Sequence, residues 1–142
     1  MRDAVSATSR SGTLLRIIDA SAVVELLSVS ERAGAVERAI RNVHLAAPDS
    51  INPEVLNAVR GLERSGQIDG ERAGEMVDDF LSMSITRIPT LDLAPDAWCL
   101  RSNLTAYDAC YVALTRRLGA ELITGDRRLA GAPNLGITLV MV

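Results

Sequence analysis

The sequence contains no lysine, and all 15 of its basic residues are arginines. This absence excludes a P-loop lysine on phosphate, a Schiff-base lysine and a lysine general base, because each needs a compact, titratable ammonium group. Histidine is almost absent too. His44 stands alone and no Gly-x-Ser-x-Gly motif occurs, so a serine hydrolase has no support, and we interpret His44 as structural or exposed. Any chemistry must therefore come mainly from the 18 acidic residues.

Cysteine and long apolar runs are scarce as well. Cys99 and Cys110 lack the spacing of a metal site, so we expect two buried, reduced thiols and no disulfide. No apolar run approaches the roughly 20 residues of a membrane span, and the polar residues 1–12 lack the apolar core of a secretory signal. We therefore expect a cytoplasmic protein with no membrane partner, in which residues 1–13 form a flexible lead-in.

The rest of the composition is that of one globular domain. A chain of 142 residues is long enough to bury a sizeable core, and 48% hydrophobic with 23% charged residues argues against disorder. We place a single domain at residues 14–142.

Short aliphatic segments alternate with helical patterns along this domain. The predicted strands are residues 14–18, 44–47, 85–88, 121–124 and 137–142. The predicted helices begin near residue 22 and then span residues 31–41, 52–64, 71–83, 95–102 and 105–118. Asn52 is the expected N-cap of the third helix, with Pro53 at its first position. The alternation indicates an α/β domain with a mainly parallel sheet that helices cover on both faces.

Four acids stand where such folds bind ligands, beyond the carboxyl ends of the strands. Asp19 follows the first strand and Asp126 follows the fourth, while Glu54 and Asp108 lie in the first turns of helices. Each acid alone is explained equally well by helix capping or by the helix dipole. Together they predict a site for a hard cation, because clustered carboxylates repel each other and oxygen ligands favour Mg²⁺ or Mn²⁺ over zinc.

The same clustering predicts an effect on stability. If four carboxylates converge, their repulsion destabilises the metal-free protein, and Asp126→Asn is expected to stabilise it. If Asp126 only caps a helix, the same substitution is expected to cause a small loss of stability.

Four segments carry a resemblance to a known family. They are Ile17-Ile-Asp-Ala-Ser-Ala-Val-Val24, Pro53-Glu-Val-Leu-Asn-Ala-Val-Arg60, Leu104-Thr-Ala-Tyr-Asp-Ala-Cys-Tyr-Val-Ala-Leu114 and Leu122-Ile-Thr-Gly-Asp-Arg-Arg-Leu129. In this order and at these separations they resemble the successive motifs of PIN-domain ribonucleases, and among these the VapC toxins of type II toxin–antitoxin pairs. The match covers residues 14–142.

The resemblance implies a three-layer α/β/α sandwich around a short, mainly parallel five-stranded sheet. The catalytic and metal-binding residues that it implies are Asp19, Glu54, Asp108 and Asp126. The supporting polar residues that it implies are Ser21, Asn57 and Thr124. The implied chemistry is hydrolysis of RNA phosphodiester bonds with Mg²⁺ or Mn²⁺. Gly125 is a departure, since many relatives have a bulkier residue there.

The resemblance also implies partners: an RNA substrate, a VapB-like antitoxin that blocks the acidic site, and a second copy in a homodimer. The helical hairpin of residues 53–83 is a candidate groove for the antitoxin. Its apolar residues are Val55, Val59, Leu62, Met76, Phe80 and Leu81. The alternative is that these side chains belong to the core.

The net charge of the chain is −3 at pH 7, so the chain as a whole does not attract RNA. We therefore expect arginines around the cleft to make the contacts with RNA. The main candidates are Arg127 and Arg128, which follow Asp126, and Arg60. Further candidates are Arg64, Arg101, Arg116 and Arg117. Aromatic residues are few and we expect Trp98 in the core, so recognition of RNA shape is favoured over base stacking.

Two other functions stay open. A catalytically idle PIN-like module would only bind a partner, although retention of all four acids argues against it. An aspartyl-phosphate phosphohydrolase would also place Asp19 after its first strand. Ser21 stands where such phosphatases have a second aspartate, however, and the lysine that stabilises the phosphoryl group is absent.

Overall fold

The fold is built on a sheet of five strands. The computed structural model describes residues 12–142, so the lead-in predicted for residues 1–13 lies outside the described residues except for its last two positions. The strands are β1 (Leu14–Ile18), β2 (Val43–Pro48), β3 (Ile85–Ile88), β4 (Glu121–Thr124) and β5 (Thr138–Met141). Their order is β3-β2-β1-β4-β5, and every neighbouring pair is parallel. The predicted five-stranded sheet is confirmed.

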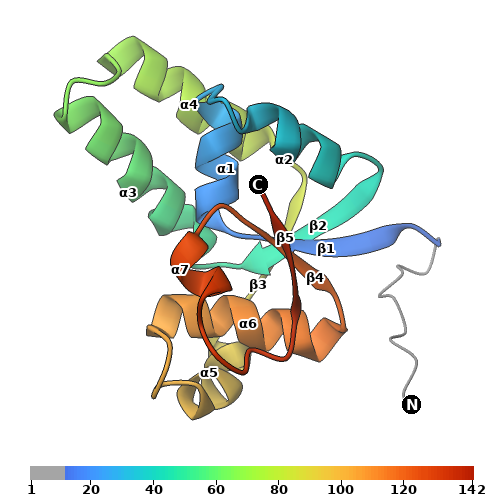
Figure 1. Ribbon diagram of the computed structural model, residues 1–142. Coiled ribbons are helices and arrows are strands. Elements are labelled where there is room, and N and C mark those ends of the chain that lie inside the picture. The colour runs from blue at the N-terminus through green and yellow to red at the C-terminus, as the bar shows by residue number, and fades with distance from the viewer. Residues whose placement is uncertain (1–11) are drawn as a thin grey trace.

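Helices form a layer on each face of this sheet. They are α1 (Ala20–Leu27), α2 (Ala33–Ile40), α3 (Ile51–Arg64), α4 (Gly70–Ser82), α5 (Thr90–Cys99), α6 (Ala106–Leu118) and α7 (Arg127–Ala130). Figure 1 shows α1 to α4 on one face and α5 and α6 on the other, which confirms the three-layer α/β/α sandwich. Across residues 12–142, no helix has both the length and the apolar character needed to cross a membrane.

The carboxyl halves of β1 and β4 are apolar on both faces because helices cover both sides of the sheet. Ile17 and Ile18 of β1 are fully buried, as are Leu122 and Ile123 of β4. Their burial fixes the carboxyl ends of β1 and β4 side by side, where the backbone N–H of Asp19 donates a hydrogen bond to the Ile123 carbonyl at 3.1 Å.

The direction in which the sheet grows reverses between β1 and β4. β2 and β3 extend it on one side of β1, and β4 and β5 extend it on the other. A crevice forms beyond the carboxyl ends of the strands at such a point. Asp19 follows β1 directly and Asp126 lies two residues beyond β4, so both acids stand at this crevice.

The start of α3 differs from the prediction. The helix begins at Ile51 with Ser50 at the N-cap position, so the assignment of Asn52 as the cap is wrong. Asn52 Oδ1 instead accepts a hydrogen bond from Arg87 Nε at 3.1 Å, which ties α3 to β3. Glu54 remains in the first turn of the helix, as predicted.

The helix predicted over residues 95–102 is also misplaced. α5 begins at Thr90, directly after Pro89, and it contains Pro95 in its interior. Proline at the first position of a helix is common, which is why Pro95 suggested a start. Its missing N–H removes the hydrogen bond that position 95 would otherwise donate to the Leu91 carbonyl, and Leu91 is highly exposed.

Burial corrects two further expectations. Trp98 is 66% exposed and not in the core, and the Arg101 guanidinium lies 4.5 Å from the centre of its ring. Cys99 is exposed, and Cys110 is only half-buried. Both cysteines are free, as predicted, and His44 is exposed.

Most of the apolar residues proposed for an antitoxin groove on the hairpin of α3 and α4 belong to the core of the domain. Of these six apolar residues, Leu62 is half-buried and Leu81 is 67% exposed. The buried ones are Val55, Val59, Met76 and Phe80. These four side chains pack into the core of the domain, because α3 and α4 both lie against α1.

Candidate active site

Asp19 occupies the centre of the crevice. Its residue is only 7% exposed, and its side chain caps the N-terminus of α1 by accepting a hydrogen bond from Ala22 N at 3.0 Å. Ser21 Oγ donates to Asp19 Oδ1 at 2.6 Å, and Thr124 Oγ1 donates to Asp19 Oδ2. Burial raises the pKa of this carboxyl above its ordinary value, although the hydrogen bonds from Ser21, Thr124 and Ala22 oppose the shift. Asp19 is thus a buried acid held in one orientation.

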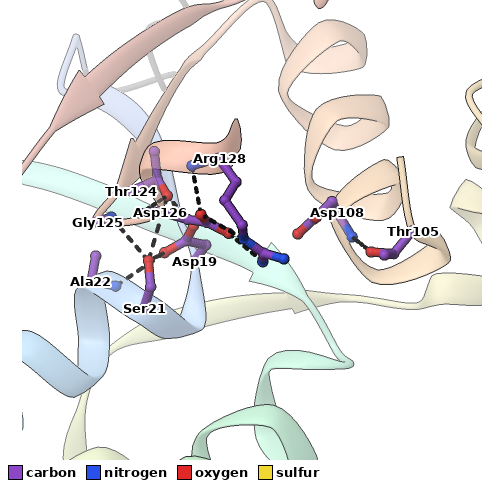
Figure 2. A network of polar contacts seen from close by, with 9 residues as sticks. All are labelled: Asp19, Ser21, Ala22, Thr105, Asp108, Thr124, Gly125, Asp126 and Arg128. Carbon is purple, nitrogen blue, oxygen red and sulfur yellow. Dashed lines mark hydrogen bonds and ion pairs between the residues drawn. The ribbon is translucent and has the colours of Figure 1, made fainter. Parts of the chain in front are cut away.

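The two hydroxyl residues predicted to support the site join β1 to the loop after β4 (Figure 2). Ser21 Oγ accepts a hydrogen bond from Gly125 N at 2.9 Å, and Thr124 Oγ1 accepts one from Asp126 N at 3.0 Å. A Cβ atom added at Gly125 would lie 3.5 Å from Ser21 Oγ, which is an ordinary contact. The glycine is therefore not required by crowding at the Cβ position.

Asp126 is engaged by its own helix. Its side chain caps α7 by accepting a hydrogen bond from Arg128 N at 2.9 Å, and it pairs with Arg128 Nη2 at 2.9 Å. The hydrogen bond from the Arg128 side chain is the main reason that the pKa of Asp126 is lowered. Figure 2 shows the Arg128 side chain lying between Asp126 and Asp108.

Glu54 reaches the crevice from α3 and is held by a residue that the sequence reasoning missed. Tyr111 of α6 donates its hydroxyl proton to Glu54 Oε2 at 2.7 Å, and its residue is only 2% exposed. Burial raises the pKa of Glu54, and the carboxylates of Asp19 and Asp108 add to the shift. A signal was present in the sequence, because Tyr111 lies three residues after Asp108 and therefore on the same face of a helix.

Asp108 stands in the first turn of α6. Thr105 caps this helix and accepts a hydrogen bond from Asp108 N at 3.2 Å, as the capping pattern in the sequence suggests. Burial is the main cause of a raised pKa for Asp108, and the charge of Asp126 adds to it while Arg128 opposes it.

The four acids thus surround one crevice without forming a closed cluster. The charge of Asp126 raises the pKa of Asp19 and of Asp108, and the charges of Asp19 and Asp108 raise the pKa of Glu54, so the four acids share one electrostatic field. Across residues 12–142, however, no three Asp, Glu, His or Cys side chains lie close enough together to hold a metal ion as they stand. The physical reason is local: Asp126 turns toward Arg128, and Glu54 toward Tyr111.

An open cleft of about 770 Å³ lies beside these acids. Its lining residues are Pro53, Glu54, Leu56, Asn57, Arg60, Thr105, Tyr107, Asp108 and Arg128. Two of the three main arginine candidates, Arg60 and Arg128, therefore face the cleft, and so does Asn57. Arg127 is exposed but does not line it.

The other arginine candidates make contacts elsewhere. Arg116 donates to the carbonyls of Leu135 and Asn134, and Arg117 pairs with Asp96 at 3.0 Å. Arg64 is exposed at the far end of α3. None of these three lines the cleft.

The donor set suits a hard divalent cation. All four candidate ligands are carboxylates, and three of them have raised pKa values because burial and mutual repulsion leave their charge incompletely compensated. A cation in the crevice compensates that charge, and oxygen ligands favour Mg²⁺ or Mn²⁺. Arg128 is the only guanidinium paired with one of the four acids within residues 12–142.

Comparisons with known proteins agree with this architecture. The PIN domain model matches residues 16–135 of the chain. Ribonuclease VapC12 of Mycobacterium tuberculosis is 38% identical over 114 residues, which cover 80% of this chain and 88% of that protein. Ribonuclease VapC1 of the same species is 36% identical over 128 residues, which cover 89% of this chain and 96% of that protein. The crystal structure of VapBC2 from Rickettsia felis, bound to a DNA fragment from their promoter, matches with a TM-score of 0.60 at 15% identity. It covers 89% of this chain and 97% of that chain, and it shows the likeness of the fold.

Proposed function

The chain belongs to the PIN domain family and its VapC ribonucleases, and we propose that it is a toxin that hydrolyses RNA phosphodiester bonds with Mg²⁺ or Mn²⁺. One observation carries the proposal. Four carboxylates from four elements surround the crevice between β1 and β4, and two guanidinium groups line the cleft beside them. Negative charge for a cation and positive charge for phosphate thus stand next to each other.

The four acids would hold the cation. Asp19 and Asp108 are the primary ligands in this proposal, directly or through water, and Glu54 and Asp126 complete the site. When bound, the cation supplies a water of lowered pKa and neutralises charge on the phosphate oxygens. Ser21 and Thr124 fix the direction of the Asp19 carboxylate by their hydrogen bonds.

Arg128 has two roles in this proposal. In the protein alone its guanidinium neutralises Asp126, and its side chain is 83% exposed. A phosphate bound in the cleft would pair with the Arg128 guanidinium in place of Asp126. The Asp126 carboxylate would then be free to bind the cation. Arg60 offers a second phosphate contact from α3.

The direct test is cleavage of RNA by the purified protein with chelator, Mg²⁺ or Mn²⁺. We expect cleavage with either metal and none with chelator. An idle partner-binding module would give no cleavage under any condition. An aspartyl-phosphate phosphohydrolase would release inorganic phosphate from small phosphate esters and leave internal RNA bonds intact.

Partners form the second part of the proposal. The VapBC2 structure supports a VapB-like antitoxin as a partner of this chain, and we propose that this partner inhibits it. We also propose a homodimer and a cytoplasmic location. Coexpression with the antitoxin followed by copurification tests the first partner, and light scattering on the chain alone tests the second. A monomer at micromolar concentration would contradict the homodimer.

The two consecutive arginines after Asp126 allow a matched comparison. We expect Arg128→Ala to weaken RNA binding and to reduce the slope of log affinity against log salt by up to about one unit, because one phosphate contact is lost. Arg127→Ala should leave the slope unchanged, since Arg127 does not line the cleft. Equal slopes for the two variants, measured in chelator to prevent cleavage, would remove Arg128 from the RNA-binding surface.

The Tyr111 hydroxyl provides a further test. Tyr111→Phe keeps the buried ring and removes the hydrogen bond to Glu54. We expect cleavage to fall by about tenfold to a hundredfold, because one hydrogen bond to a charged group contributes about 1.5–3 kcal/mol. The concentration of Mg²⁺ needed for half-maximal cleavage should rise as well. An unchanged metal dependence would mean that Tyr111 does not position Glu54.

A further inference from the structure

Tyr107 is an aromatic residue that does not pack in the core of the domain. Its residue is 60% exposed although it belongs to α6, directly before Asp108. Within residues 12–142 its hydroxyl has no hydrogen-bond partner. Tyr111, one turn further along the same helix, shows the contrast, because that ring is buried and its hydroxyl is engaged. The exposure of Tyr107 therefore has no explanation in the packing of the domain.

Tyr107 lies in the cleft beside the four acids. The ring lines the cleft on the α6 side, and the apolar side chains of Pro53 and Leu56 line it on the α3 side. Leu56 is itself 45% exposed. An aromatic ring and an apolar wall are the surfaces against which a nucleobase packs, because every base has an apolar, polarisable face.

Polar groups in the same cleft fit the rest of a nucleotide. Arg60 and Arg128 line it with groups that bind phosphate, and Asn57 offers an amide that can pair with the edge of a base. Asp108 lines the same cleft as Tyr107, so a base on the Tyr107 ring would lie close to the proposed reacting phosphate. The cleft thus has separate places for phosphate, base face and base edge.

We propose that Tyr107 is the stacking platform for one unpaired nucleobase of the RNA next to the bond that is cleaved. The inference rests on the proposed function, and it names the part of the RNA that the cleft recognises. A base inside a continuous duplex has both faces covered by its neighbours, so the RNA must present an unstacked nucleotide at this point. This proposal replaces the expectation from the sequence that recognition of RNA shape is favoured over base stacking.

Binding of a short single-stranded RNA in chelator tests the proposal. We expect Tyr107→Ala to weaken binding at least about fivefold, and Tyr107→Phe to bind like the unchanged protein because the ring is kept. Trp98→Ala is the matched control, because Trp98 is exposed to a similar extent but lies outside this cleft. A continuous duplex RNA should bind with the same affinity to the unchanged protein and to Tyr107→Ala.

A spectroscopic readout reports stacking directly. Trp98 is the single tryptophan of the chain, so Trp98→Phe combined with Tyr107→Trp gives a protein with one tryptophan in the cleft. We expect single-stranded RNA to quench the fluorescence of this tryptophan. Trp98→Phe combined with Leu81→Trp places the reporter at an exposed position of α4 and should show no quenching. This measurement stands even if Tyr107→Ala does not fold.

The outcomes separate the inference from the proposed function. If the unchanged protein cleaves RNA with Mg²⁺ while Tyr107→Ala binds normally, or while the tryptophan introduced in the cleft is not quenched, the stacking role is overturned and the ribonuclease remains. If the unchanged protein neither binds nor cleaves RNA, the proposed function fails and the inference fails with it.

Discussion

Asp19→Asn is expected to reduce RNA cleavage by about a thousandfold or more while the protein still folds. The amide has the shape of the carboxylate but lacks its charge, and it presents only one oxygen to a cation. Loss of a ligand that helps to neutralise charge in the reaction removes several kcal/mol of stabilisation, and each 1.36 kcal/mol is a factor of ten in rate. Asp108→Asn is expected to have an effect of similar size.

The fold should tolerate the change at Asp19 because most of its hydrogen bonds persist. The side-chain oxygen that remains in Asp19→Asn can still accept from Ala22 N and Ser21 Oγ, and the Thr124 hydroxyl can rotate to accept from the new amide group. Thermal melting and copurification with the antitoxin check this in the same preparations.

Asp69→Asn is the matched control for both substitutions. Asp69 caps α4 and accepts a hydrogen bond from Arg72 N at 2.8 Å, but it lies outside the crevice. Asparagine caps a helix about as well as aspartate. We expect cleavage by Asp69→Asn to equal that of the unchanged protein. Full cleavage by Asp19→Asn and Asp108→Asn would refute the assignment of the acids.

The sequence predicts the sheet and the place of the acids because both depend on local patterns. Residues 85–88 and 121–124 are short aliphatic runs between helical patterns, and the structure has strands with these bounds. Asp19 comes directly after its strand, so it lies at the carboxyl edge of the sheet whatever the details of the packing. Position at that edge follows from topology alone.

The sequence does not predict which way the acidic side chains turn. Asp126 is drawn to Arg128 by a two-residue contact within its own loop, and this contact depends on α7, a helix of four residues with too little pattern to be recognised. Glu54 is drawn to Tyr111, which lies 57 residues away along the chain. The exposure of Trp98 likewise depends on where α5 begins, and Pro95 suggested a later start.

These orientations determine how the metal-free protein should respond to pH. Burial raises the pKa of Asp19, Glu54 and Asp108 in the folded protein above their ordinary values of 3.8, 4.5 and 3.8. An acid with a raised folded pKa destabilises the fold when ionised, and this cost disappears as pH falls through the folded pKa toward the ordinary value. Asp126 has a lowered pKa, so its stabilising effect is kept until pH falls below 3.8. In chelator we therefore expect the melting temperature to rise as the pH falls from 7 toward the ordinary pKa values of these acids.

The same reasoning reverses the expectation that Asp126→Asn stabilises the metal-free protein. In chelator at pH 7, Asp126→Asn removes the charge that pairs with Arg128, and we expect a small loss of stability because Arg128 is exposed. Asp19→Asn instead removes a buried charge, and because burial opposes that charge we expect a gain on the order of 1 kcal/mol. For a domain of this size, a change of about 1 kcal/mol corresponds to about 3–5 °C in melting temperature.

Metal should then invert the order of the unchanged protein and Asp19→Asn. A ligand that binds only the folded state raises stability by about 2.7 kcal/mol when its concentration is one hundred times its dissociation constant. Millimolar Mg²⁺ or Mn²⁺ should raise the melting temperature of the unchanged protein and of Asp69→Asn equally, and that of Asp19→Asn by much less, because a buried ligand is lost. Calorimetry of these three proteins and of Asp126→Asn measures the change in melting temperature that each substitution causes, first in chelator and then with metal. If Asp19→Asn melts lower than the unchanged protein in chelator and responds fully to metal, then Asp19 is a structural cap of α1 and the crevice has lost its central ligand.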